Sequence, residues 1–116
     1  MVLFFYPKDN SPICTKEACS FRDSYERFKE AGAEVIGVSS DSVQSHQAFS
    51  KQYQLSFPLI SDQDGSLRKL FGVSFALGLL PGRSTYVIDE EGIVRLIFSA
   101  QFASVEHVQR ALKAVS

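Results

Sequence analysis

The fold is decided by the stretch VLFFYPKDNSPIC, residues 2–14. Its first five residues are apolar, and a short apolar run of this kind predicts a strand buried on both faces of a sheet. Turn-forming residues follow. Ser11 and Pro12 then predict a helix start, because serine favours the N-cap and proline costs nothing at the first helical position. We therefore expect a strand, a loop and a helix in immediate succession.

The remaining elements follow from periodicity and turn signals. The first helix is expected to run to about Ala31 and to stop at Gly32, with Ala18, Phe21, Tyr25 and Phe28 on its apolar face. After it we expect a strand at 34–40, a helix from Asp41 or Ser42 to about Tyr53 and an extended piece at 57–60. A short helix at 67–71 and an apolar loop at 75–82 follow. The chain then forms a hairpin of 84–89 and 93–98 that turns at Gly92, and a last helix from Ser104 with Val105, Val108, Leu112 and Val115 on one face.

This order of elements predicts an α/β fold. A strand, helix and strand at the start require parallel pairing with a right-handed crossover, whereas the hairpin adds antiparallel strands. Helices must then cover both faces of a mixed central sheet. The arrangement is thioredoxin-like, and a length of 116 residues fits a single domain spanning 1–116.

Composition excludes several functions. Twelve basic and thirteen acidic residues give a net charge of −1, which leaves no basic excess for binding nucleic acid. The longest apolar run, at 2–6, is far shorter than the roughly 18 residues of a membrane span, so no membrane partner is expected. The run has neither the charged residues nor the cleavage site of a signal peptide, so it is not read as one, and we expect a cytoplasmic protein.

Cys14 is the most informative residue of the chain. Counted from Ser11 it is the third residue of the helix, where unpaired amides and the helix dipole favour a thiolate over a thiol. A thiolate is a nucleophile, so this position is typical of a reactive cysteine. The alternative is that Cys14 is a small hydrophobic residue of the core.

Cys19 lies five positions further along the same helix. Five helical residues separate two Cα atoms by about 8.7 Å, whereas a disulfide requires at most about 7 Å. The two cysteines therefore either never pair or pair only when the first helical turns unwind. The spacing does not suit zinc, and we expect His46 and His107 to be exposed helix residues, so neither a metal nor another cofactor is predicted.

Arg83 is the candidate cation for a thiolate. It stands at the entrance to the strand 84–89, and in a thioredoxin-like sheet that point lies beside the start of the first helix. Its forked donors could hold the thiolate and stabilise a leaving oxygen. An arginine in such a sequence is, on composition alone, more often a surface residue.

These motifs resemble the peroxiredoxins. The stretch PKDNSPIC, residues 7–14, is similar to the family signature of proline, three residues, threonine or serine, two residues and cysteine. The stretch CTKEACSFRD, residues 14–23, resembles the peroxiredoxin Q or bacterioferritin comigratory protein subgroup, whose second cysteine lies five positions downstream. The stretch LPGRSTYVID, residues 80–89, is similar to the segment that carries the family's arginine.

The resemblance implies a role for each residue. Cys14 would attack hydrogen peroxide or an organic hydroperoxide and become a sulfenic acid, and Cys19 would resolve it as a disulfide. Arg83 and Ser11 would hold the peroxide, while Pro7 would shield the sulfenic acid from water. Thioredoxin or a similar dithiol protein would regenerate the enzyme.

The resemblance also bears on assembly and location. It implies a monomer acting in cell redox homeostasis and antioxidant defence, in the cytoplasm or, after removal of a transit peptide, in a plastid. Family members carry a leading β-hairpin and a short helix that this chain is expected to lack. Two alternatives stand beside the peroxidase: a non-enzymatic redox sensor or client-binding module, and a dithiol–disulfide reductase, which favours two intervening residues between its cysteines rather than four.

Overall fold

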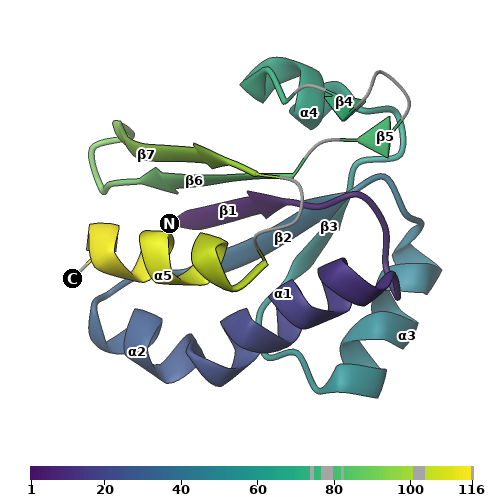
Figure 1. Ribbon diagram of the computed structural model, residues 1–116, viewed down its shortest axis with the longest axis horizontal. Coiled ribbons are helices and arrows are strands. Elements are labelled where there is room, and N and C mark those ends of the chain that lie inside the picture. The colour runs from purple at the N-terminus through teal and green to yellow at the C-terminus, as the bar shows by residue number, and fades with distance from the viewer. Residues whose placement is uncertain (74, 77–79, 82, 101–103, 116) are drawn as a thin grey trace.

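A mixed five-stranded sheet forms the centre of the molecule (Figure 1). The computed structural model describes residues 1–73, 75–76, 80–81, 83–100 and 104–115. Its elements are β1 (Val2–Phe5), α1 (Pro12–Asp23), α2 (Tyr25–Glu30), β2 (Val35–Ser39), α3 (Val43–Tyr53), β3 (Leu59–Ser61), α4 (Ser66–Phe71), β4 (Phe75–Ala76), β5 (Leu80–Pro81), β6 (Ser84–Ile88), β7 (Val94–Ser99) and α5 (Ser104–Val115).

The strand order is β3-β2-β1-β6-β7. β1, β2 and β3 are parallel to one another, whereas β6 is antiparallel to both β1 and β7. The predicted α/β class with a mixed sheet is therefore confirmed. Of the loop expected at 75–82, the described part forms the small antiparallel sheet of β4 and β5, and residues 77–79 and 82 lie outside the described residues.

β1 lies between two strands and is buried along its whole length, as its sequence predicts. Its side chains alternate between the faces, since successive residues of a strand point in opposite directions. Val2 and Phe4 pack in the core formed with α1, α2, α3 and α5, whereas Leu3 and Phe5 pack with residues of α4. Helices therefore cover both faces, with α1, α2, α3 and α5 on one side and α4 on the other (Figure 1).

The first helix differs from the prediction. It is divided at Ser24, whose backbone φ of −97° and ψ of 2° ends α1 before α2 begins. Serine disrupts helices because its hydroxyl competes for backbone hydrogen bonds. The predicted apolar face nevertheless continues through the break, since Phe21 and Phe28 are both fully buried. Gly32, with a φ of +75°, ends α2 as expected.

The hairpin turns at Gly92, whose φ of +80° confirms the predicted left-handed position. β7 is an edge strand of the sheet, and Ile97 there is 62 % exposed. In α5 the predicted apolar face is wrong at Val105, which is 38 % exposed, because His107 and Ala111 take the buried side of the helix instead.

Both histidines are buried, so their predicted exposure is wrong. Buried polar groups persist when they are hydrogen-bonded, and each ring has a partner on both nitrogens. His46 faces Asp9 and the carbonyl of Ile60, and His107 faces Thr85 and the carbonyl of Ala100. None of the helices in the described ranges is long and apolar enough to cross a membrane.

Candidate active site

Cys14 occupies the first turn of α1. Ser11 is the N-cap by its extended backbone, with a φ of −73° and a ψ of 150°, and Pro12 is the first helical residue. The first helical hydrogen bond runs from the amide of Thr15 to the carbonyl of Ser11, at 2.9 Å. Cys14 is therefore the third residue of the helix, as predicted, and its side chain is only 1 % exposed.

Arg83 reaches Cys14 from the start of β6. In the antiparallel pairing of β1 with β6, Phe5 lies opposite Ser84, so the residue before Ser84 lies where β1 leads into the loop toward α1. Nη2 of Arg83 lies 3.1 Å from Sγ of Cys14 and donates to it. Arg83 is 3 % exposed, so the surface interpretation of this arginine is wrong and its predicted proximity to the helix start is confirmed.

Glu17 completes a buried group of three and was missed from the sequence. Nη1 of Arg83 donates to its Oε1 at 2.5 Å, so the guanidinium bridges a carboxylate and a sulfur. Glu17 lies three residues after Cys14, within the run of positions that the apolar face of α1 uses. An acidic residue in a buried helical stripe is the signal that could have identified it.

His107 approaches this group from α5. Its Nδ1 lies 3.7 Å from Oε2 of Glu17 and 2.7 Å from the hydroxyl of Thr85. Within the described part of the chain, Oε2 of Glu17 accepts no hydrogen bond. Burial raises the pKa of Glu17 to about 7 against the opposing effect of Arg83, and burial lowers the pKa of His107.

Replacing Glu17 with glutamine is expected to flatten the dependence of stability on pH. Glu17 has a pKa of about 7 when folded and an ordinary value of 4.5. The folded state therefore keeps a proton that the unfolded state loses, and the free energy of unfolding falls as pH rises from about 4.5 to about 7. The fall amounts to at most about 3 kcal/mol. Urea unfolding of both proteins across this range measures it.

The wild type is the reference for this comparison because His107 acts with the opposite sign. Its lowered pKa makes the unfolded state bind the extra proton, so its contribution to stability rises with pH up to its ordinary value of 6.5. The difference between the variant and the wild type reports the proton of Glu17 together with the effect of its carboxylate on His107, which lies 3.7 Å away. Parallel curves for the two proteins would show that Glu17 is ionised across the range.

The other predicted site residues lie nearby in sequence but make different contacts. Ser11 is half-buried, and its hydroxyl donates to the carbonyl of Lys8 at 2.9 Å rather than to an amide of the helix. Pro7 is half-buried at the start of the same loop. Cys19 is half-buried on α1, and both cysteines are free thiols while the helix is intact.

Asp9, Asp41 and His46 place three possible metal-ligand atoms within 4.8 Å of one another. Their donor atoms already take part in hydrogen bonds. Oδ2 of Asp9 accepts from Ser45 and faces His46, and Oδ2 of Asp41 accepts from Ser39 and from the amide of Asp9. We therefore assign the cluster as a hydrogen-bond network.

The fold and the site together define a thioredoxin-like thiol protein, in which a buried cysteine at a helix start faces an arginine. The sequence profile of the AhpC/TSA family matches residues 1–97, and the chain belongs to this family. It is similar to the chloroplastic peroxiredoxin Q of Sedum lineare, with 54 % identity over 114 residues, which are 97 % of this chain and 61 % of that protein.

Solved structures agree with this assignment. The crystal structure of the peroxidoxin BcpB from Mycobacterium tuberculosis has a TM-score of 0.91 at 39 % identity, over 98 % of this chain and 76 % of that one. The bacterioferritin comigratory protein of Xanthomonas campestris has a TM-score of 0.86 at 39 % identity, over 97 % of this chain and 77 % of that one. The chain thus spans about three fifths of the plant relative and about three quarters of these two structures.

Proposed function

We propose that this chain is a thiol-dependent peroxidase that reduces hydrogen peroxide and organic hydroperoxides. The Cys14 thiolate would form an S–O bond as the O–O bond of the peroxide breaks, which gives a sulfenic acid. The leaving oxygen takes a proton and departs as water or an alcohol. The observation that carries the proposal is the 3.1 Å contact between Nη2 of Arg83 and Sγ of Cys14.

Arg83 suits the charge movement of this reaction. Negative charge passes from sulfur to the leaving oxygen, and a fixed cation beside both atoms stabilises the transition state. Glu17 accepts from Nη1 and so orients the planar guanidinium, which leaves Nη2 directed at the sulfur. Glu17 is therefore a positioning residue that acts through Arg83.

Ser11 and Pro7 would complete the peroxide site. The Ser11 hydroxyl donates its proton to the carbonyl of Lys8, so its lone pairs are the part that can accept a hydrogen bond from a peroxide O–H. Pro7, at the start of the same loop, would shield the sulfenic acid from water. Both roles follow from the resemblance of residues 7–14 to the peroxiredoxin signature.

Cys19 would resolve the sulfenic acid. Its thiol would attack the sulfur of Cys14, an S–S bond would form, and the sulfenic hydroxyl would leave as water. With α1 intact the two Cα atoms stand about 8.7 Å apart, which exceeds the reach of a disulfide. The first turns of α1 must therefore unwind before the bond can form, as the spacing of the cysteines predicts.

Thioredoxin or a similar dithiol protein would return the disulfide to two thiols. We propose a single domain over residues 1–116, acting as a monomer without nucleic acid or membrane partners. The Sedum lineare relative is named chloroplastic, which favours a plastid over the cytoplasmic location expected first.

The names of the relatives support the peroxidase over the alternatives. Work on the Xanthomonas campestris protein concerns its alkyl peroxide reduction activity. A redox sensor or client-binding module needs no hydrogen-bond donor directed at its thiolate. In this chain Arg83 is buried and its Nη2 donates to Sγ of Cys14. A dithiol reductase would favour a shorter spacing than that between Cys14 and Cys19.

Replacing Cys19 with serine tests the proposal. The wild type is expected to consume peroxide over many turnovers with reduced thioredoxin, whereas Cys19→Ser still oxidises at Cys14 but loses thioredoxin-dependent turnover, because no disulfide forms for thioredoxin to attack. Peroxide consumption over time, with and without thioredoxin, measures both steps. A wild type that consumes at most one equivalent would favour the redox sensor instead.

A further inference from the structure

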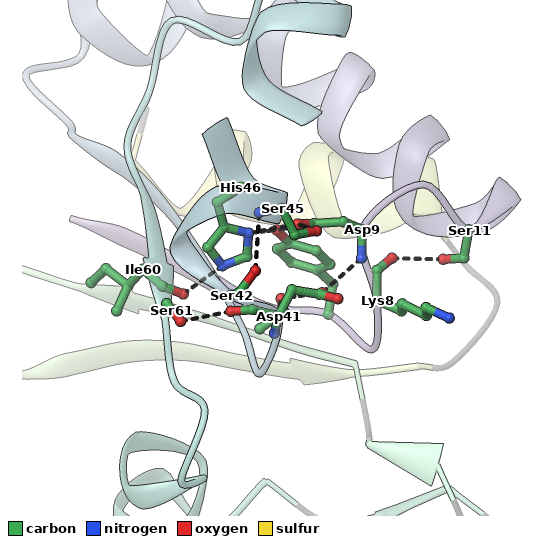
Figure 2. Close-up of polar contacts among 11 residues, drawn as sticks. Lys8, Asp9, Ser11, Asp41, Ser42, Ser45, His46, Ile60 and Ser61 are labelled. Atoms are coloured by element: carbon green, nitrogen blue, oxygen red, sulfur yellow. Dashed lines mark hydrogen bonds and ion pairs between the residues drawn. The ribbon is translucent and has the colours of Figure 1, made fainter. Parts of the chain in front are cut away.

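The loop between β1 and α1 is held in place by a buried polar network (Figure 2). Asp9 is its centre. Oδ1 accepts from the hydroxyl of Tyr6 at 2.6 Å, and Oδ2 accepts from the hydroxyl of Ser45 at 2.8 Å. The same Oδ2 lies 2.7 Å from Nδ1 of His46, and the amide of Asp9 donates to Oδ2 of Asp41 at 2.8 Å. The side chain and the backbone of Asp9 are thus both fixed.

His46 strengthens this attachment from α3. Its Nδ1 faces the carboxylate of Asp9, and its Nε2 faces the carbonyl of Ile60 at 3.0 Å, so both neighbours are acceptors (Figure 2). The contact with Asp9, together with the hydrogen bond from Ser45, joins the loop to α3.

A second attachment lies at the other end of α1. Nη1 of Arg22 donates to the carbonyl of Tyr53, the last residue of α3, at 2.7 Å. Just before Arg22, the ring of Phe21 is fully buried and stacks on Phe4 at 4.4 Å between centroids. The same helix, α3, thus holds the chain at Asp9 and again at Arg22.

Both cysteines lie between these two attachments. Each attachment is also next to a discontinuity of the backbone. Asn10, with a φ of 64°, follows Asp9, and Ser24 interrupts the helix two residues after Arg22. Residues 10–21 thus form a segment with a defined beginning and end, and we name it the cysteine segment.

We propose that α3 is a fixed frame that confines unwinding to the cysteine segment. This inference rests on the disulfide of the proposed function. Residues 12–21 are the ten helical residues of this segment and span about 15 Å, whereas the same residues extended reach about 33 Å. The unwound segment is therefore longer than the distance it must span, so Cys14 and Cys19 can approach each other while Asp9 and Arg22 keep their contacts with α3.

Hydrogen exchange of the protein with a preformed disulfide tests this frame. Diamide removes the two thiol hydrogens and becomes its hydrazine, which leaves an S–S bond between Cys14 and Cys19 without any peroxide. In the oxidised wild type we expect amides to lose protection within residues 10–21. Peptides covering residues 2–9 and 27–30 should exchange as they do in the reduced protein. The amide of Ser24 donates to the carbonyl of Ser20 inside the segment, so it should lose protection together with the segment.

A variant at either attachment is expected to move the end of the unprotected stretch that lies next to that attachment. In the oxidised state, Asp9→Asn should extend the loss of protection into residues 6–9, and Arg22→Gln should extend it into α2. Exchange there should accelerate about tenfold or more, since each variant removes a charge-assisted hydrogen bond. His46→Gln replaces Asp9→Asn if the latter does not fold.

The control for both variants is Tyr86→Phe, which removes a hydrogen bond to the carbonyl of Phe71 on the opposite face of the sheet. It should keep the wild-type boundaries. The proposal is overturned if the wild type unwinds past either attachment, if the variants keep the wild-type boundaries, or if diamide forms no bond between the cysteines. Expected boundaries in a protein that does not consume peroxide would overturn only the peroxidase.

Discussion

Replacing Cys14 with serine is expected to abolish peroxide consumption. A serine hydroxyl fills nearly the same volume, but it stays protonated at neutral pH and is a poor nucleophile without an adjacent base. Arg83 donates a hydrogen bond to the side chain at position 14, but as a cation it cannot accept the proton of a serine hydroxyl. Consumption of hydrogen peroxide with dithiothreitol as reductant measures the loss.

Cys19→Ser is the matched control for this experiment. It also removes one thiol from α1, yet it should still oxidise at Cys14, and dithiothreitol can reduce a sulfenic acid directly. Circular dichroism of both variants shows whether the helices remain. If Cys14→Ser still consumed peroxide while Cys19→Ser did not, Cys19 would be the attacking residue and the assigned order of the two cysteines would be wrong.

Replacing Arg83 with glutamine is expected to slow the oxidation of Cys14 by about 10²- to 10³-fold, which is the usual loss when one fixed donor to a transition state is removed. Glutamine keeps a donor but loses the charge and the fork that joins Glu17 to Cys14. Stopped-flow measurement of the second-order rate constant with hydrogen peroxide gives the effect. Arg95→Gln, at an exposed ion pair with Asp89, is the matched control.

The same substitution has a second consequence, because it leaves Glu17 buried without its cation. Removal of one partner of a buried pair typically costs about 3–5 kcal/mol. The double variant Glu17→Gln with Arg83→Gln removes both charges, and it should recover stability without recovering the rate. Recovery of the rate in the double variant would mean that Arg83 only neutralises Glu17 and does not act on the sulfur.

Local signals account for what the sequence predicts well. The apolar run at 2–6, the serine and proline at 11–12 and the glycines at 32 and 92 each act over a few residues. They place β1, the start of α1, the end of α2 and the hairpin where the structure has them. The place of Cys14 in the first turn of α1 is predicted for the same reason, since it follows directly from the cap.

Tertiary contacts account for what the sequence could not predict. His46 and His107 are on helix positions that look exposed in isolation, and only partners from distant segments, Asp9 and Thr85 among them, allow their burial. Glu17 is buried for the same reason, since Arg83 lies 66 positions away. The exposed apolar side chains of β7 follow from its place at the edge of the sheet.

The intact mass of the fully reduced protein after one equivalent of hydrogen peroxide shows whether Cys14 and Cys19 react as proposed. We predict a rapid loss of two hydrogens, because Cys14 is oxidised and Cys19 then closes the disulfide within one chain. An unchanged mass would contradict the claim that Cys14 is a peroxide-reactive thiolate. A stable gain of one oxygen would contradict the claim that α1 unwinds to let Cys19 reach it.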